Sequence, residues 1–134
     1  MTRPNVRQRG YDSRWDPLAR DFKARYPFCL GCWALGLETP TEVTDHIMPL
    51  AHHRDGLLDQ TNLQPSCRWH HDVCKRHLEL MWKLGQLPES ALKLDSLSAR
   101  VFTRERYPIP IGVDGYPLWQ WSDLQRKPYP GGRP

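Results

Sequence analysis

Apolar residues recur at helical spacing near the start of the chain. Within residues 13–26 they are Trp15, Leu18, Phe22 and Tyr26. A spacing of three or four residues aligns such side chains on one face of a helix. Ser13 stands where an N-cap is expected, Pro17 falls in the first turn, and Pro27 follows the last apolar residue. The pattern predicts a helix over residues 13–26.

The middle of the chain shows a shorter period. Residues 43–47 alternate between two sets, with Val43, Asp45 and Ile47 set against Thr44 and His46. Alternation with a period of two is typical of a short strand. A polar loop follows, then a second short strand that starts near Asn62, and then a helix from Cys67 to about Leu84. The expected order is strand, loop, strand and helix.

The chain changes character at Gly85 and Pro88. The segment PESALKL predicts a short helix, and the residues after it read as a proline-rich extended tail. Within this tail Trp119 and Trp121 alternate like an edge strand packed on the core. These boundaries divide the chain into three parts. Residues 1–27 form a basic N-terminal arm and helix, residues 28–84 a central core, and residues 85–134 a C-terminal extension packing on that core.

The composition supports one small domain. Of the 134 residues 39% are hydrophobic and 13 are prolines, so the core is expected to be small and to need a stabilising metal. No apolar run approaches the roughly 18 residues that would span a membrane, and the first residues lack the apolar stretch of a secretory signal. We therefore expect a cytoplasmic protein whose four cysteines are metal ligands or free thiols rather than disulfides.

The positive charge is concentrated at the N-terminus. Residues 1–26 contain seven basic and three acidic side chains, a balance of +4, whereas residues 27–134 contain twelve of each sign. A basic arm on a neutral body suits contact with the phosphates of nucleic acid. Solubilising, disordered tails have the same composition, so both interpretations stay open at this point.

Two half-sites with the spacing of metal ligands flank the first predicted strand. They are Cys29-Leu-Gly-Cys32 and Cys67-Arg-Trp-His70. A tight turn, eased by Gly31 in the first half-site, directs both ligands of a pair toward one tetrahedral metal. Together the half-sites predict a Cys₃His zinc site made by Cys29, Cys32, Cys67 and His70.

Two alternatives to this assignment remain at the level of sequence. Cys74 lies one helical turn after His70 and would share its face, so it is the rival for the fourth ligand position. Cys74 also fits an apolar helix face with Leu78, and we favour that interpretation. The Cys29–Cys32 spacing alone would equally suit a thiol redox motif, but the chain lacks a thioredoxin-like βαβ pattern.

The central segment resembles the HNH endonuclease family. The stretches VTDHIMPL and DQTNLQPSCRWHHDVCK carry the resemblance, which extends over roughly residues 9–120. It implies an active site formed by the Asp45-His46 pair, Asn62 and His71. The stretches RGYDSRW, PFCLGC, LKLDS and IGVDGYPLW are similar to small phage and prophage members, which are commonly encoded beside DNA-packaging genes. His70 departs from many members, which carry a second cysteine at that place.

The resemblance implies a fold, a function and partners. The fold is a small α+β, zinc-stapled ββα-metal domain with an N-terminal helix and a proline-rich C-terminal extension. The function is metal-dependent hydrolysis of DNA phosphodiester bonds, by nicking or double-strand cutting, in phage DNA packaging. The implied partners are double-stranded DNA and the phage terminase or portal proteins. The alternative function is a non-catalytic, zinc-stabilised module that binds nucleic acid.

Residue chemistry leads to roles for the same side chains. Neighbours on a strand point to opposite faces, so a bend is needed for Asp45 to hold a metal while His46 faces substrate. Neutral histidine suits general base catalysis near pH 7, which assigns the proton of the attacking water to His46. Asp45 and His71 would ligate a divalent ion such as Mg²⁺ or Mn²⁺. Asn62 is expected to pin the loop rather than to touch metal.

Other titratable residues receive weaker expectations. His52 and His53, in the loop after the first strand, are expected to be solvated, and His77 is expected to be structural. The basic residues Arg68, Lys75 and Arg76 flank the proposed metal helix. They suit either phosphate contacts or a solvated helix face, and the pattern does not separate the two.

Overall fold

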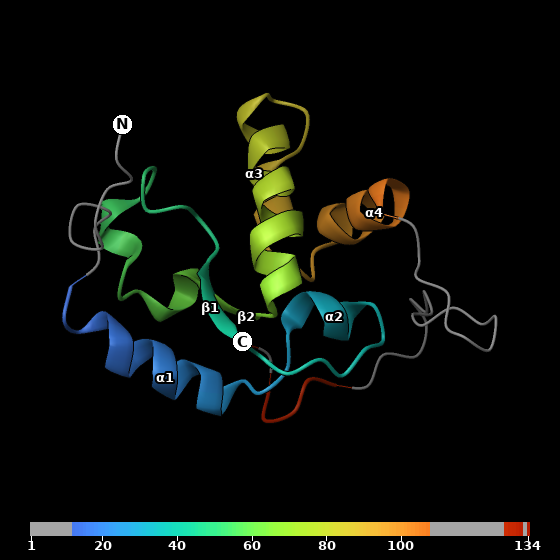
Figure 1. Cartoon of the computed structure of the whole chain (residues 1–134). Coiled ribbons are helices and arrows are strands. Elements are labelled where there is room, and N and C mark those ends of the chain that lie inside the picture. Colours follow the sequence, from blue (N-terminus) through green and yellow to red (C-terminus); the bar gives the residue numbers. More distant parts are fainter. Residues whose placement is uncertain (1–11, 108–127, 133) are drawn as a thin grey trace.

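The structure is a computed structural model that describes residues 12–107, 128–132 and 134. Its elements are a short two-stranded antiparallel sheet, several α-helices and a few single turns of helix (Figure 1). The α+β class expected from the pattern is therefore confirmed. Within the described residues no helix has the length and apolar character needed to cross a membrane.

The first predicted helix is confirmed as α1 (Trp15–Arg25), with Phe22 as its buried residue. The N-cap position is held by Arg14 and not by Ser13, and no side chain caps it. Asp12 Oδ1 instead accepts a hydrogen bond from the Arg14 main-chain nitrogen at 2.9 Å. The helix packs on the first strand, where the Thr44 hydroxyl donates to the carbonyl of Ala19 at 3.0 Å.

The two expected strands form one antiparallel pair. They are β1 (Val43–His46) and β2 (Leu63–Ser66), and the register places Asp45 opposite Gln64. All of β2 is buried. Between the strands lie two 3₁₀ turns, η1 (Arg54–Gly56) and η2 (Gln60–Asn62).

The helix expected after β2 is present, but its first part is wider than an α-helix. Residues His70–Lys75 form a π-helical turn, η3, which continues as α3 (Arg76–Lys83). The helix ends at Lys83 with Leu84 as its C-cap. The φ of 74° at the following Gly85 allows the Gln86 nitrogen to reach the Met81 carbonyl at 2.9 Å. A π turn is rare and is frequently found at functional sites.

Two helices were not expected from the sequence. The first half-site folds into α2 (Leu30–Ala34) rather than a simple turn, with Cys29 at its N-cap. A second helix, α4 (Leu97–Arg106), begins where Ser96 accepts a hydrogen bond from the Ala99 nitrogen. The predicted short helix around PESALKL is a 3₁₀ turn, η4 (Glu89–Leu92), which contacts both α3 and α4.

Two clusters of buried residues stand out in the described core. The larger lies between α3, η4 and α4, and its buried members are Cys74, Leu78, Ala91, Leu94, Ala99 and Phe102. The smaller is formed by Cys29, Cys32 and Cys67, with Leu37 and Trp69 packed against it. Three thiols bury little apolar surface, so this cluster by itself contributes little hydrophobic stabilisation.

The C-terminal residues that the structure describes return to the first half-site. Tyr129 is buried, and its hydroxyl accepts a hydrogen bond from the Phe28 nitrogen at 3.0 Å and donates one to the Phe28 carbonyl. The basic arm before residue 12 and the tail residues Trp119 and Trp121 lie outside the described residues. Predictions made for those segments therefore stay predictions.

Candidate metal centre and polar cluster

The four predicted zinc ligands come together in space. The ligand atoms of Cys29, Cys32, Cys67 and His70, the thiol cluster, all lie within 4.8 Å of one another, and all four residues are buried. Among the described residues this is the one group of three or more histidine, cysteine or carboxylate side chains placed to hold a metal. The Cys₃His assignment is confirmed to this extent: the cluster forms and could hold an ion such as Zn²⁺.

The spacing within the thiol cluster fits tetrahedral zinc. With Zn–S bonds of about 2.3 Å and Zn–N bonds of about 2.0 Å, a tetrahedron separates sulfur atoms by about 3.8 Å and sulfur from nitrogen by about 3.5 Å. The Sγ atoms of Cys32 and Cys67 are 3.8 Å apart. His70 Nδ1 lies 3.3, 3.4 and 3.6 Å from the sulfurs of Cys32, Cys67 and Cys29. These separations are close to those of a tetrahedral zinc site.

Local structure prepares the sulfurs for a cation. Each half-site directs a main-chain N–H at its first sulfur, from Cys32 to Cys29 and from His70 to Cys67, both at 3.4 Å. Such donors favour the thiolate form. Hydrogen bonds from the neighbouring thiols of Cys29 and Cys32 lower the pKa of Cys67. Hydrogen bonds with Cys29 and Cys67 raise the pKa of Cys32, so without a metal the negative charge is favoured on Cys67 and not on every sulfur. A bound metal would favour the thiolate form throughout.

Cys74, the rival ligand, is not part of this cluster. Its thiol lies 3.2 Å from the Thr103 hydroxyl and packs in the larger core cluster. Burial raises its pKa to about 11, so the group stays a neutral thiol. The interpretation of Cys74 as an apolar residue of the helix face is confirmed.

Gly31 matters to the thiol cluster because it has no side chain, and not because its backbone is flexible. A Cβ at this position would lie 2.4 Å from Cδ2 and 2.5 Å from Nε2 of His70. Only a residue without a side chain lets α2 approach the imidazole this closely. The sequence argument that Gly31 eases a turn missed this contact, because the contact joins segments about forty residues apart.

Replacing Gly31 by Ala should therefore displace His70 and weaken the metal centre. We expect a loss of about 1–3 kcal/mol in unfolding free energy, the usual cost of overpacking, together with faster loss of zinc to a chelator. Gly85→Ala is the control, because it strains a positive φ but meets nothing within 4 Å. The measurement is the rate at which each variant loses zinc to a chelator. Equal rates in the two variants would show that the contact between Gly31 and His70 is unimportant.

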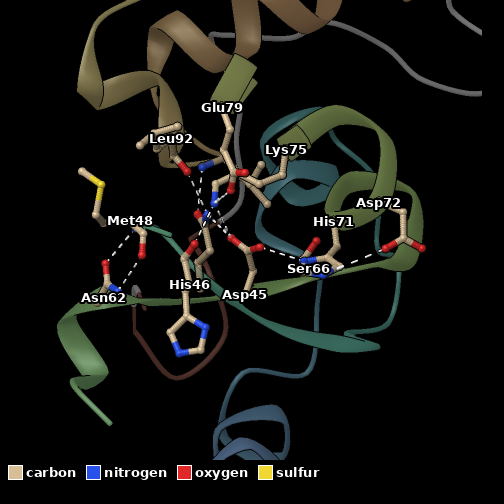
Figure 2. A network of polar contacts seen from close by, with 12 residues as sticks. Asp45, His46, Met48, Asn62, Ser66, His71, Asp72, Lys75, Glu79 and Leu92 are labelled. Carbon is tan, nitrogen blue, oxygen red and sulfur yellow. Dashed lines mark hydrogen bonds and ion pairs between the residues drawn. The ribbon is translucent and has the colours of Figure 1, made fainter. Parts of the chain in front are cut away.

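A second polar cluster lies beside β1, and Figure 2 shows its contacts. His71 Nδ1 donates to Asp45 Oδ1 at 2.8 Å, while Asp45 Oδ2 lies 3.0 Å from Lys75 Nζ and 2.8 Å from Gln64 Nε2. Lys75 also contacts Glu79 at 3.0 Å. We call Asp45, Gln64, His71, Lys75 and Glu79 the polar cluster.

Exposure within the polar cluster is uneven. The Asp45 side chain is 3% exposed, whereas that of His71 is 40% exposed. Burial alone would raise the pKa of Asp45, but the Lys75 charge and the hydrogen bonds from His71 and Gln64 outweigh it and hold that pKa below its usual value. Asp45 is therefore a fixed negative charge with one open neighbour, His71.

The ring of His46 points away from the polar cluster, in another direction from β1, as Figure 2 shows. Its ring stacks on Trp15 of α1, with centroids 4.5 Å apart. Nε2 lies 3.1 Å from the Leu57 carbonyl, which can only accept, so the neutral ring carries its proton on Nε2 and its lone pair on Nδ1. Burial lowers the pKa of His46, which favours that neutral form.

The two imidazoles thus differ in charge preference. The hydrogen bond to Asp45 raises the pKa of His71, opposite to the shift at His46. Neighbouring titratable groups whose environments shift their pKa values apart are typical of sites that divide acid and base roles.

Asn62 joins the two ends of the loop between the strands. Its side chain accepts from the Met48 nitrogen at 2.8 Å and donates to the Met48 carbonyl at 3.1 Å, and its main-chain carbonyl accepts from Ile47 at 2.7 Å. All three bonds fix the chain just after His46. This is the pinning geometry that was expected of Asn62.

The remaining candidates are distributed as follows. His52 makes an edge contact with the Trp82 ring. His53 and Asn62 line a polar pocket of about 370 Å³. His77 hydrogen-bonds the Tyr107 hydroxyl at 2.8 Å and is structural, as expected. Arg76 is exposed, and Arg68 pairs with Glu42 at 3.4 Å on the surface.

Lys75 contradicts both expectations stated for it. It is 1% exposed, so it belongs neither to a solvated helix face nor to a surface that meets phosphate. Sequence reasoning missed Lys75, Gln64 and Trp15 as neighbours of the site. The one available signal was that Gln64 stands opposite Asp45 once the two strands are paired.

Comparison of the chain with protein-family models, with curated proteins and with solved structures finds no match. The chemistry of this protein therefore has to be inferred from its own residues.

Proposed function

We propose that this chain is a divalent-metal-dependent endonuclease of the HNH type that hydrolyses phosphodiester bonds of double-stranded DNA. One observation supports the proposal most strongly. Asp45 and His71 form a 2.8 Å pair with one buried and one half-exposed member, next to a second histidine whose environment favours a neutral ring. The thiol cluster would hold a structural Zn²⁺ and would not take part in the reaction.

The donor set of the pair fits a hard divalent ion. Two ligand atoms about 2.1 Å from one octahedral ion, at right angles, lie about 3 Å apart. Asp45 Oδ1 and His71 Nδ1, separated by 2.8 Å, would be such neighbours after the ion displaces the shared proton. A metal held by only these two side chains would keep open positions and would neutralise charge on the scissile phosphate and its leaving oxygen.

The histidine and asparagine roles follow from their contacts. His46 Nδ1 would accept the proton of the attacking water while Nε2 stays bonded to the Leu57 carbonyl. The water oxygen would bond to phosphorus and the bond to the 3′ oxygen would break. That oxygen would take up a proton from solvent, so the products would be a 5′-phosphate and a 3′-hydroxyl. Asn62 would hold the chain after His46 so that the ring keeps its alignment.

The charge balance is consistent with a nucleic-acid substrate. The net charge of +4 resides in residues 1–26, and α1, which carries part of it, also supplies the Trp15 ring that stacks on His46. We propose that α1 directs phosphates toward the site, and that the activity serves phage DNA packaging beside terminase and portal proteins.

Supercoiled plasmid tests the proposal against its alternative, a non-catalytic zinc module that binds nucleic acid. The zinc-loaded protein is incubated with plasmid in the presence or absence of Mg²⁺ or Mn²⁺. A nuclease converts the plasmid to open-circular or linear DNA only with the added metal. A binding module retards the plasmid without breaking it, and that result would overturn the enzymatic proposal.

A further inference from the structure

Lys75 is the largest fully buried side chain of the described core. Its Nζ donates to the His46 carbonyl at 2.7 Å and contacts Asp45 Oδ2 and Glu79 Oε1, each at 3.0 Å. Three acceptors match the three N–H bonds of an ammonium group. Lys75 therefore joins the main chain and the side chain of two neighbouring strand residues, His46 and Asp45, as Figure 2 shows.

The contacts of Lys75 make the two oxygens of Asp45 unequal. Oδ2 receives both Lys75 Nζ and Gln64 Nε2, whereas Oδ1 faces His71. Gln64 is itself fixed, because it also donates to the Leu92 carbonyl and accepts from the Leu94 nitrogen. The carboxylate is therefore held so that Oδ1 is the oxygen directed toward the exposed side of the cluster.

Lys75 is the last residue of the π-helical turn η3 and lies four residues after His71. Both side chains reach the same carboxylate, one at each oxygen. A buried ammonium is costly unless it is paired, and apolar residues usually serve a core as well. A paired lysine placed against a proposed ligand therefore calls for an explanation beyond packing.

We propose that Lys75 is a positioning residue that limits Asp45 to one ligand oxygen and lowers the affinity of the site for its divalent metal. This inference rests on the proposed function. Asp45, Glu79 and Lys75 together carry one net negative charge. A weakly held metal that has only one carboxylate oxygen keeps more of its charge for the phosphate.

The test measures Mn²⁺ binding to the zinc-loaded full chain by calorimetric titration. The variant Lys75→Met with Glu79→Gln removes the ammonium and one carboxylate, so the net charge of the group is unchanged. Asp45 then has no ammonium beside it, and we expect the dissociation constant for Mn²⁺ to fall by about tenfold or more. Arg76→Met is the matched control, because it removes an exposed positive charge from the same helix and should leave that constant unchanged.

A second variant keeps the test decisive if the double variant does not fold. Glu79→Gln alone leaves the Lys75 charge less balanced beside Asp45, so Mn²⁺ should bind about threefold or more weakly. Unchanged or weaker binding in the folded double variant, or unchanged binding in Glu79→Gln, overturns the role of Lys75. If wild-type protein binds no Mn²⁺ through Asp45 and His71, the proposed function itself has failed.

Discussion

Replacing Cys29 by Ser is expected to unfold the protein at ambient temperature. Structural zinc contributes on the order of 10 kcal/mol to folding in small modules, which is as large as the whole stability of most domains. The thiol cluster offers little apolar packing to compensate, since its buried hydrophobic members are the ligands Cys29, Cys32 and Cys67 themselves. Circular dichroism melting and metal analysis of the purified protein measure both consequences.

The matched control for this variant is Cys74→Ala. Cys74 is as buried as Cys29, but it packs in the larger core cluster with Leu78 and Phe102. We expect one zinc per chain in this variant and a loss of only about 1 kcal/mol. Folded wild-type protein without zinc, or with a disulfide between Cys29 and Cys32, would contradict the metal assignment.

Features that depend on short sequence spacing were predictable. The two half-sites each place two ligands three residues apart, and such spacing fixes where both ligands point whatever the rest of the fold does. The helix over residues 13–26 was predicted from its apolar period, and the structure has it at Trp15–Arg25. The strand pair and the helix after it were predicted in the same way.

Features that depend on long-range packing were not predictable in this way. Lys75 precedes the exposed Arg76, and a lysine is buried only where acceptors are supplied for its ammonium group. Two of the three acceptors of Lys75, on His46 and Asp45, belong to β1, and they become visible only once the helix lies against the sheet. Helix α4 was missed although Ser96 gives it a regular N-cap, because its exposed Leu97 and Val101 hide the apolar face made by Ala99 and Phe102.

The largest catalytic effect is expected from His46→Ala, which should abolish plasmid cutting but keep metal binding. Loss of a general base typically slows a reaction by about 10²–10⁴-fold. His46 is held by Trp15 and the Leu57 carbonyl, apart from the Asp45–His71 pair. Its removal should therefore leave the Mn²⁺ dissociation constant nearly unchanged.

Removing a proposed metal ligand should instead reduce metal binding itself. Asp45→Asn and His71→Ala should weaken Mn²⁺ binding, and a higher Mn²⁺ concentration should restore part of the cutting rate. Asn62→Ala should slow cutting with a smaller effect on metal, because it frees the chain at Met48 from two hydrogen bonds. All of these variants should retain zinc, since the thiol cluster uses other residues.

Single-turnover cleavage and calorimetric titration on the same protein samples separate these roles. His52→Ala is the histidine control, because His52 is exposed and its ring contacts the Trp82 ring. This variant should cut at the wild-type rate. If His46→Ala loses the metal while His71→Ala keeps it, the roles of the two histidines are reversed. If the variants at Asp45, His46, Asn62 and His71 all cut at the wild-type rate, the reaction takes place elsewhere. Asp45 and His71 would then be a structural ion pair, and the chemistry would have to be sought among residues outside both clusters.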